Sequence, residues 1–368
     1  MLVIVRESGE IGIKSPFTRS RMENVLIKNI KSTVQVRDVY KEGGLIFLDI
    51  EGDFKKLSKV FGIASYSPVK QIEFNNMEEI VKNAEEEFKE VVKGKKFAVR
   101  VKRVGNHNFT SLDLARSIGS SLYKYSSGVD LENPEAEVYV YVRYNKAYLY
   151  KEVYEGPKGL PVGTSGRTIV LFSGGFDSPV ATWFMMKRGN VPIILNFLLG
   201  GNIHKEIVLN EVKLLREWSG SNSLYVYLVN GIKVQMKLAS VEPKIRIVVL
   251  KRVMYKTAEV LASRLGAHSI TTGESLSQVS SQTVWNLEAT EYGISLPVFR
   301  PLIGFDKDEI IKYSKIIGTY ELSSKLPEYC VISANSTTRA KVKDVIRAEE
   351  SLEIDYNKLI DEAEVVKI

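Results

Sequence analysis

The stretch from Thr168 to Thr182 constrains the fold most strongly, because an apolar run leads directly into a pair of glycines. Ile169 to Phe172 form a short, continuous apolar run, which is typical of a parallel strand covered on both faces. The glycines that follow allow the backbone to turn sharply, and Pro179 is favoured at the first position of a helix. We therefore expect a strand, a glycine turn and a helix, with Ser178 as the N-cap of the helix.

A corner of this kind is suited to binding phosphate, because backbone N–H groups and a helix N-terminus converge on one anion. The stretch lacks both the G-x-x-x-x-G-K-[ST] and the G-x-G-x-x-G patterns. Its residues Ser173 to Ser178, S-G-G-F-D-S, resemble the S-G-G-x-D-S pyrophosphate loop (PP-loop) of ATP pyrophosphatases, which cleave ATP to AMP and pyrophosphate. An ordinary corner between a strand and a helix is the alternative.

The 368 residues are enough for two or three domains, and the clearest linker is the segment 155–166, which is rich in glycine and proline. After it, apolar runs alternate with helical patterns. The predicted strands cover Thr168 to Phe172, Val191 to Phe197, Leu224 to Val229, His268 to Thr272 and about Leu296 to Phe299. This order predicts an α/β domain over residues 165–368 with a doubly wound parallel sheet, whose ligands bind at the carboxyl ends of the strands.

Residues 1–58 combine strand-like runs with a helical stretch from Thr18 to Lys31, which predicts a small α+β unit. In residues 59–164 the pattern starts again, and a basic run there leads into a polar turn that contains His107. Alternate residues of a strand share a face, so Arg100 and Lys102 are expected to form a surface suited to phosphates. A solubilising charge run is the alternative.

Composition sets further limits on function. The net charge of +7 fits a polyanionic partner, although an excess of this size decides little alone. Cys330 is the only cysteine, which excludes an internal disulfide and a cysteine-ligated iron–sulfur cluster, and the three histidines lack the spacing of a metal site. We find no apolar run of membrane-spanning length and no signal peptide, so we expect no membrane partner and a cytoplasmic location.

Four blocks carry a resemblance to one family, in order and spacing: Ser173 to Ser178, Lys251-Arg252, Thr272 to Gln282, and Leu326 to Ser333. The chain resembles the tRNA 4-thiouridine synthetases (tRNA sulfurtransferases of the ThiI type) over essentially its whole length. The resemblance implies a ferredoxin-like domain in residues 1–58 and a THUMP RNA-binding domain in residues 59–164. Residues 165–368 would be the PP-loop ATP pyrophosphatase domain.

The resemblance also implies a reaction. ATP would activate the O4 atom of a tRNA uracil, near the elbow at position 8, as an adenylate with release of pyrophosphate. A persulfide on Cys330 would then supply sulfur to C4. The implied cofactors are ATP and Mg²⁺, with Asp177 as both catalytic residue and metal ligand; a simple helix cap is the alternative role of Asp177.

The resemblance assigns the remaining site residues in two groups. Those that would contact ATP come from three strand ends and one helix: Leu171, Phe172, Ser173, Gly174, Gly175, Asp177, Ser178, Asn196, Phe197, Lys251, Gly273 and Gln282. Those that would contact tRNA are Lys95, Lys96, Arg100, Lys102, Arg103 and His107. The alternative for the strand-end residues is that they are ordinary core residues. The alternative for Lys251 is that it lies on a solvent-exposed helix face.

The chain departs from many bacterial relatives, which carry a C-terminal rhodanese domain. We therefore expect a separate sulfur donor, which is a cysteine desulfurase, a rhodanese-like protein or sulfide. Sulfur supply to the thiazole of thiamine is a second role that only the resemblance suggests. The rival functions are a PP-loop synthetase or amidotransferase of a small molecule and a non-catalytic tRNA-binding protein. The sequence leaves open whether two chains form a homodimer.

Overall fold

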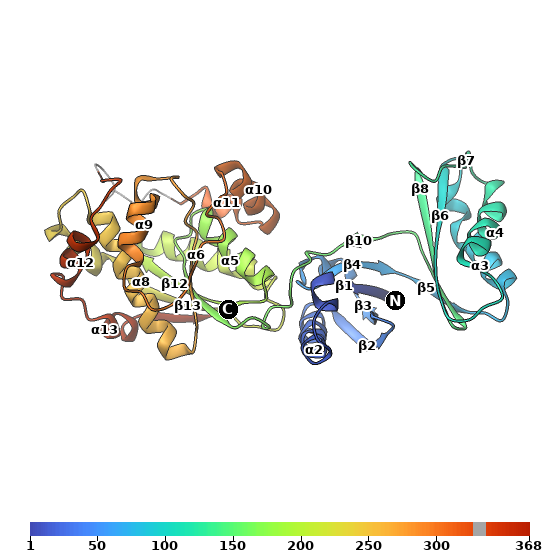
Figure 1. The fold of residues 1–368 in the computed structure, drawn as a ribbon, viewed down its shortest axis with the longest axis horizontal. Helices are drawn as coiled ribbons and strands as arrows, with labels where there is room; N and C mark the ends of the chain where they lie inside the picture. The colour runs from blue at the N-terminus through green and yellow to red at the C-terminus, as the bar shows by residue number, and fades with distance from the viewer. Residues whose placement is uncertain (327–335) are drawn as a thin grey trace. The chain divides into compact units, whose positions relative to one another are not determined.

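The computed structural model describes residues 1–326 and 336–368. The chain forms two compact units (Figure 1). Unit 1 consists of Met1–Gly12, Val34–Ser58 and Ile63–Lys158, and unit 2 consists of Ile13–Thr33, Lys59–Gly62 and Gly159–Ile368.

The first sheet of unit 1 is antiparallel and has the strand order β10-β4-β1-β3-β2. Its strands are β1 (Leu2–Glu7), β2 (Gln35–Glu42), β3 (Leu45–Glu51), β4 (Ile63–Pro68) and β10 (Tyr154–Glu155). The short segments α1 (Gly9–Gly12) and η1 (Phe54–Lys59) follow β1 and β3. The sheet therefore includes strands on both sides of residue 58.

The second sheet of unit 1 has the order β5-β9-β8-β6-β7. Its strands are β5 (Lys70–Glu73), β6 (Lys96–Val104), β7 (Gly128–Val129), β8 (Ala136–Arg143) and β9 (Lys146–Tyr150). The helices α3 (Met77–Val92) and α4 (Ser111–Tyr123) bury apolar residues against β8, including Val138 and Val140. Thr110 begins α4 with a capping box, in which its hydroxyl and the Asp113 carboxylate accept from each other's backbone.

The sheet of unit 2 has the order β15-β14-β11-β12-β13-β16. Its parallel strands are β11 (Arg167–Leu171), β12 (Val191–Leu198), β13 (Tyr225–Asn230), β14 (Ile270–Thr272) and β15 (Val298–Phe299). The predicted doubly wound parallel sheet is confirmed. The structure adds β16 (Glu364–Lys367), which pairs antiparallel to β13 and which the charged C-terminal sequence did not indicate.

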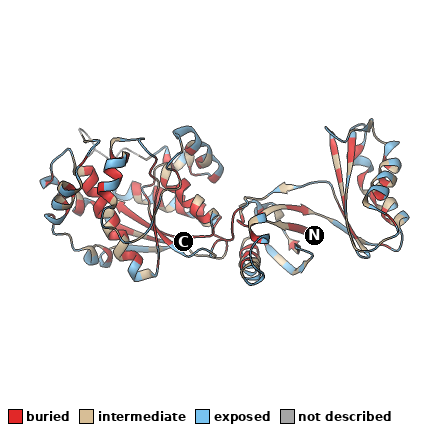
Figure 2. Cartoon of the chain, viewed as in Figure 1, coloured by how far each residue is buried: buried red, intermediate tan, exposed pale blue. Residues whose placement is uncertain are grey.

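Helices cover both faces of this sheet. Ile169 of β11 packs with one group, α8 (Arg246–Leu265), α9 (Val284–Glu291), α12 (Val342–Glu350) and α13 (Tyr356–Asp361). Its neighbour Val170 packs with the other group, α5 (Asp177–Lys187), α6 (Gly201–Arg216) and α10 (Lys307–Ile317). Smaller pieces are α7 (Gly231–Lys237), η2 (Leu238–Ser240), η3 (Ser280–Gln282) and α11 (Tyr320–Ser323). Buried residues follow the strands and the inner sides of the helices (Figure 2), as a continuous apolar strand requires.

The predicted N-terminal helix, expected over Thr18 to Lys31, is present as α2 (Pro16–Thr33) and is slightly longer than predicted. By its contacts the segment Ile13–Thr33 groups with unit 2. The physical reason is Asn29, which is 1% exposed and donates from Nδ2 to the Val162 carbonyl at 3.0 Å. Its Oδ1 accepts from the backbone N–H of Ser221 at 3.0 Å and from the Ser221 hydroxyl at 2.9 Å.

We predict that Asn29→Ala lowers the free energy of unfolding by about 1–3 kcal/mol, because it leaves buried donors and acceptors unpaired. Urea unfolding of the full chain measures the loss. The matched control is Asn210→Ala on the exposed side of α6, which should change stability by less than about 0.5 kcal/mol. Equal effects of the two substitutions would show that Asn29 does not hold α2 in place.

Candidate active site

The candidate site lies at the carboxyl ends of three neighbouring strands. β11 pairs in parallel with β14 on one side and with β12 on the other. β12 and β13 follow β11 on one side of the sheet, whereas β14 and β15 lie on the other side, so the strand order reverses between β11 and β14. Doubly wound sheets bind their ligands at this topological switch point. The segment Ser173 to Ser178 follows β11, Asn196 lies near the end of β12, and Gly273 follows β14.

The turn after β11 depends on glycine and on one hydroxyl. Gly174 has a φ of +83°, a conformation that strains other residue types. Helix α5 begins at Asp177 with Phe176 at the N-cap position, so the prediction of Ser178 as N-cap was wrong. The Ser178 hydroxyl instead accepts from the backbone N–H groups of Ser173 at 3.2 Å and Gly174 at 3.3 Å. A side chain that bonds to nearby backbone in this way competes with capping and closes the turn.

Gly273 brings a second strand end against this turn. A Cβ atom at residue 273 would lie 2.8 Å from the carbonyl carbon of Asp177, which is closer than real Cβ contacts. The glycine therefore lets the end of β14 approach the first residue of α5. The predicted site residues Gly273 and Asp177 are thus brought together by backbone packing.

Asp177 faces a cation that the sequence analysis missed. Its Oδ1 atom lies 3.3 Å from Nζ of Lys307, the first residue of α10. Nζ also lies 5.0 Å from the centre of the Phe176 ring. A lysine in the first turn of a helix interacts unfavourably with the helix dipole. This unfavourable position is the sequence signal that would have pointed to a functional role for Lys307.

Polar side chains support the turn from β12 and α6. Nε2 of His204 lies 2.7 Å from the Ser173 carbonyl, which fixes that nitrogen as the donor. Burial lowers the pKa of His204, partly offset by this hydrogen bond. Nδ2 of Asn196 donates to the Phe172 carbonyl at 2.7 Å. The end of β11 is therefore held by neutral groups that do not change the charge of the site.

Glu211 of α6 lies behind the same turn. A Cβ atom on Gly174 would be 3.7 Å from Oε2 of Glu211, and Oε1 accepts from the Ser323 hydroxyl at 2.6 Å. Burial raises the pKa of Glu211 to about 9, so the carboxyl group is neutral at pH 7. Ser323 is the last residue of α11 and precedes Cys330 closely in the sequence. The predicted catalytic residue Cys330 itself lies outside the described residues.

The raised pKa of Glu211 predicts a pH-dependent stability. The folded state keeps a proton that the unfolded chain releases near the ordinary glutamate pKa of 4.5, so stability is greatest below that pH. It should fall by at most about 1.4 kcal/mol per pH unit as the pH rises toward 9. Glu211→Gln keeps a neutral side chain of the same size, and we predict that its unfolding free energy loses this slope.

Urea unfolding between pH 5 and pH 9, on the alkaline side of about 4.5, measures the difference between wild type and Glu211→Gln. Glu206→Gln, on the exposed side of the same helix, is the matched control and should keep the wild-type slope. Parallel pH profiles for wild type and Glu211→Gln would contradict a protonated Glu211.

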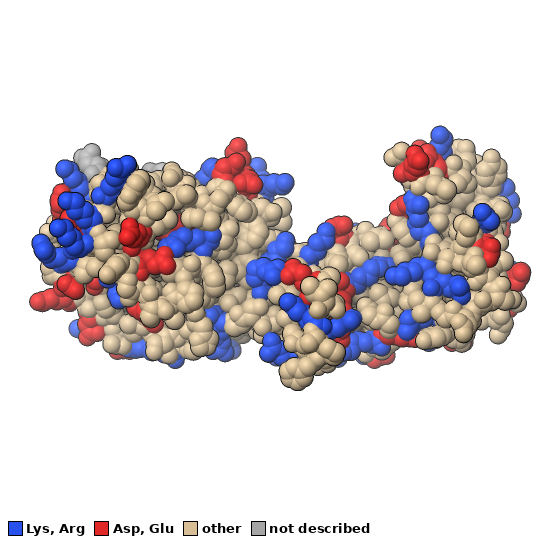
Figure 3. Space-filling view, viewed as in Figure 1, with Lys and Arg blue, Asp and Glu red and all other residues tan. Residues whose placement is uncertain are grey.

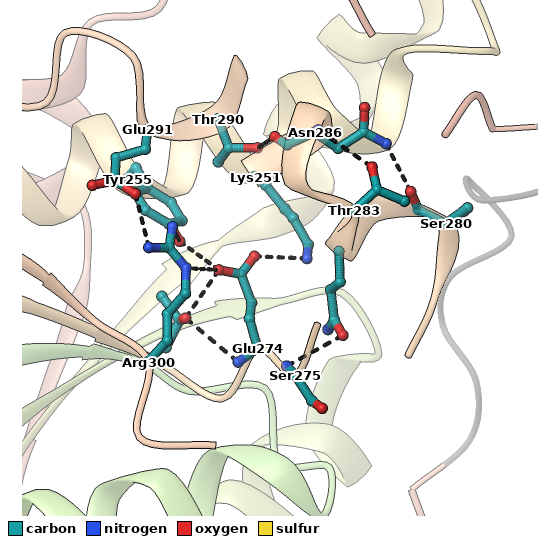
Figure 4. A network of polar contacts seen from close by, with 12 residues as sticks. Lys251, Tyr255, Glu274, Ser275, Ser280, Thr283, Asn286, Thr290, Glu291 and Arg300 are labelled. Atoms are coloured by element: carbon teal, nitrogen blue, oxygen red, sulfur yellow. Dashed lines mark hydrogen bonds and ion pairs between the residues drawn. The ribbon is translucent and has the colours of Figure 1, made fainter. Parts of the chain in front are cut away.

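A buried ionic network holds Lys251 at the end of β14 (Figure 4). Glu274 is its centre, with Oε1 at 2.9 Å from Nζ of Lys251 and Oε2 at 3.0 Å from Nε of Arg300. Oε2 also accepts from the hydroxyls of Tyr255 at 2.7 Å and Thr272 at 3.0 Å. Burial alone would raise the pKa of Glu274, but the charges of Lys251 and Arg300 lower it to about 2.

The network changes the interpretation of Lys251. Its side chain is only 20% exposed and is paired, so it is not a residue of a solvated helix face. The predicted residue Gln282 belongs to the same loop, where its Oε1 accepts from the backbone N–H of Ser275 at 3.4 Å. Lys251, Gly273 and Gln282 are thus assembled around the segment that follows β14, and Glu274 and Arg300 are the partners that the sequence analysis missed.

We predict that Glu274→Gln lowers the free energy of unfolding by about 3–5 kcal/mol, because it leaves two cations without their buried acid. Thermal and urea unfolding measure the loss. Glu288→Gln on the exposed side of α9 is the control and should be close to neutral. Wild-type stability of Glu274→Gln would show that the network does not hold the end of β14.

The predicted RNA-contacting residues belong to unit 1. Lys95 and Lys96 are exposed, and Arg100 and Lys102 are both exposed on alternate positions of β6. Arg100 is paired with Glu137 at 2.8 Å. Nη1 of Arg103 lies 3.0 Å from Nδ1 of His107, and Nε2 of His107 lies 2.6 Å from the Tyr144 carbonyl. Arg103 and His107 thus shape the turn after β6, and RNA contact by all six residues stays a prediction.

Within residues 1–326 and 336–368, no group of three or more His, Cys, Asp or Glu side chains is arranged to hold a metal ion. No helix in the same part of the chain has the length and apolar character needed to cross a membrane.

Comparison with protein families assigns each part of the chain. Residues 163–354 match the family model described as thiamine biosynthesis protein (ThiI). Residues 74–152 match the THUMP domain, and residues 2–67 match the ThiI ferredoxin-like domain. The three matches follow the order of domains expected from the sequence.

Individual proteins match over the full length. A protein of Sulfurisphaera tokodaii named "Probable tRNA sulfurtransferase" is 62% identical over 368 residues, with 100% of both chains covered. A protein of the same name from Saccharolobus solfataricus is 55% identical, again with 100% of both covered. The crystal structure of a 4-thiouridine synthetase–RNA complex with bound ATP matches with a TM-score of 0.89 and 31% identity, covering 100% of this chain and 99% of that chain.

Proposed function

The chain belongs to the ThiI family of tRNA sulfurtransferases, and from this premise we propose how its residues convert a tRNA uracil to 4-thiouridine with ATP. It is a tRNA sulfurtransferase with a ferredoxin-like domain, a THUMP domain and a PP-loop domain. The domain boundaries 58/59 and 164/165 are part of the proposal. So are a cytoplasmic location and the use of ATP together with Mg²⁺.

The observation that carries the proposal is the S-G-G-F-D-S turn at the switch point of the sheet. The O4 atom of uracil is a poor leaving group until it is bonded to AMP. Forming that bond releases pyrophosphate, whose charge the turn is built to stabilise through the backbone N–H groups of Gly174 and Gly175 and the N-terminus of α5. Lys307 adds a positive charge beside the same turn.

Asp177 fits the role of magnesium ligand. Magnesium is usually held by one or two carboxylates together with phosphate oxygens, and it would neutralise the charge of the phosphates. The Asp177 side chain is 27% exposed, and its Oδ1 atom makes one contact of 3.3 Å with Nζ of Lys307. The carboxylate is therefore accessible to an ion at the turn. The residues Ser173 and Ser178 would complete the phosphate contacts.

Adenine binding follows from the neighbouring strand ends. The backbone groups of Leu171, Phe172, Asn196 and Phe197 lie at the carboxyl ends of β11 and β12, where a nucleotide base can be framed without a charged partner. In the proposal Lys251, held by Glu274, meets a phosphate as a point charge, and Gly273 and Gln282 close the pocket.

The sulfur step is proposed for Cys330. A persulfide on Cys330 places its terminal sulfur on C4, and AMP leaves with the former O4 atom. The bond between the two sulfur atoms must then be reduced to release 4-thiouridine. Cys330 is the only cysteine of the sequence, so the reducing thiol is external, as is the persulfide donor, a cysteine desulfurase or a rhodanese-like protein. Sulfide is already at the oxidation level of the product, so as a donor it would attack the adenylated C4 directly, displace AMP and bypass the persulfide on Cys330.

Further parts of the proposal concern partners. RNA contact by Lys95, Lys96, Arg100, Lys102, Arg103 and His107 would hold the tRNA through unit 1. The similar 4-thiouridine synthetase forms a complex with RNA, which supports tRNA as the partner. A role in thiamine thiazole synthesis rests on the name of the matching family model. Homodimer formation is an additional expectation. The full-length match, which includes the THUMP domain, speaks against a small-molecule synthetase.

We predict that the protein forms 4-thiouridine in an unmodified tRNA transcript with ATP, Mg²⁺, a cysteine desulfurase with cysteine as the persulfide donor and dithiothreitol as the reducing thiol, measured by nucleoside mass analysis. Asp177→Ala and Lys307→Ala should each lower the rate by about 100-fold or more, because the first removes the proposed magnesium ligand and the second removes a positive charge beside the departing pyrophosphate. Cys330→Ser should still release pyrophosphate but form no 4-thiouridine.

The matched control is Asp308→Asn, which removes an exposed acid next to Lys307 on α10. It should keep the wild-type rate. Wild-type activity of Asp177→Ala would overturn the assignment of the turn, and absence of 4-thiouridine with the wild-type protein would overturn the function.

A further inference from the structure

The segment between β14 and α9, together with the start of α9, exposes apolar side chains. Leu276, Val279, Val284 and Trp285 are 45%, 51%, 60% and 47% exposed. The other two tryptophans, Trp183 and Trp218, are 4% and 6% exposed. An indole is among the largest apolar groups, and leaving one in water forgoes the free energy that its burial would contribute. Exposed apolar residues that gather in one segment mark an interaction site.

Arg339 covers one face of Trp285. Its guanidinium carbon lies 4.3 Å from the centre of the indole ring, within the range of a cation–π contact. The backbone on either side of Arg339 is fixed to the start of α9. Asn286 donates to the Thr337 carbonyl at 2.8 Å and accepts from the backbone N–H of Ala340 at 2.9 Å. The arginine and the indole are therefore held together by backbone hydrogen bonds and do not meet by chance as two free surface side chains.

Further cations continue this surface onto α12, which packs against α9. Lys341, Lys343 and Arg347 are exposed, and in the part of the chain that the structure describes they form no ion pair. Asp344 is the one acidic residue of the segment 339–347. Lys and Arg side chains gather over the region of α12 in the space-filling view (Figure 3). The surface is thus strongly positive beside an exposed aromatic ring.

We propose that Trp285, Arg339, Lys341, Lys343 and Arg347, called the Trp285 platform here, bind unpaired nucleotides of the substrate RNA. A base stacks on the indole or on the guanidinium plane, and the cations contact the flanking phosphates. The inference rests on the proposed function and deepens it by assigning RNA contacts to unit 2. Aromatic rings combined with arginine and lysine are the general means by which proteins hold single-stranded nucleic acid.

The position of the platform suits the proposed reaction. An enzyme that modifies a base must take it out of the helical stack, and the unstacked neighbours then need new contacts. The segment that leads to Trp285 starts at Gly273, directly after β14, and carries Gln282 in η3, whose side chain accepts from the backbone N–H of Ser275. The platform is therefore connected through one short, hydrogen-bonded segment to the candidate nucleotide site.

Trp285 supplies its own spectroscopic probe, because the other two tryptophans are buried. We expect an unmodified tRNA transcript to change the emission of the full-length protein and to protect it from acrylamide quenching. Trp285→Phe should lose both changes.

Trp285→Ala should weaken tRNA affinity about 5- to 150-fold, the range expected for one stacked base, whereas Trp285→Phe should retain most of the affinity. Replacing Lys341, Lys343 and Arg347 with alanine should reduce the salt dependence of binding by about one unit for each lost phosphate contact.

Tyr225 provides a matched control within unit 2. It is 41% exposed, lies under Nζ of Lys367 at 5.9 Å, and stands at the amino end of β13, away from the carboxyl ends of the parallel strands. Tyr225→Ala should leave tRNA affinity unchanged. Equal tRNA affinity of wild type, Trp285→Ala and the triple alanine variant would overturn the platform.

The outcomes separate the platform from the proposed function. If the wild-type protein forms 4-thiouridine but Trp285→Ala shows an unchanged KM for tRNA, the platform alone is wrong. If Trp285→Ala loses activity only when a protein supplies the sulfur, the surface binds that protein and the RNA proposal is overturned. If the wild-type protein forms no 4-thiouridine yet its tryptophan emission responds to tRNA, the function fails and the platform stands.

Discussion

The whole site depends on how closely the backbone can turn at the end of β11. Gly174 adopts a φ that other residues avoid, the Ser178 hydroxyl closes the turn from inside, and Gly273 lets β14 approach Asp177 without a clash. These constraints place one helix N-terminus and several backbone N–H groups at the switch point of the sheet. A nucleotide phosphate is what such an arrangement is suited to bind, because the protein meets its charge with dipoles that are already oriented.

Lys307 lies beside the turn after β11, and Lys251 lies beside the segment that follows β14. The burial of their acidic partners separates the roles of the two lysines. Glu274 is almost fully buried and makes contacts with Lys251, Arg300, Tyr255 and Thr272, so Lys251 is held in one position. Asp177 is partly exposed and touches Lys307 through a single contact of 3.3 Å. The first pair is a fixed part of the framework. The second pair costs little to separate, since exposed ion pairs contribute little to stability, and this supports the proposal that Asp177 and Lys307 meet a metal ion and a phosphate.

The parts of this architecture that were predictable from sequence are those encoded locally. The apolar run at Ile169, the glycine pair and the alternation of strands and helices predicted the parallel sheet and the location of the turn. Contacts between residues far apart in the sequence were not predictable. The residues around Lys307, Glu211 and Arg300 give no indication of which side chain each of them contacts in the folded chain. The contacts of Asn29 in α2 with Val162 and Ser221 were likewise not predictable. Nor was the pairing of β16 with β13, because the sequence of β16 is charged and its partner strand is distant. The prediction of Ser178 as a helix N-cap was wrong, because its hydroxyl accepts from the backbone of the preceding turn instead.

The central claim is that the uracil oxygen leaves as part of AMP, because the turn after β11 is arranged to release pyrophosphate first. The most direct measurement uses tRNA whose target uracil carries ¹⁸O at O4, with unlabelled ATP and water. Mass analysis of the AMP formed during one turnover should find one ¹⁸O atom in its phosphate and none in pyrophosphate. AMP without the label, formed together with 4-thiouridine, would contradict the account.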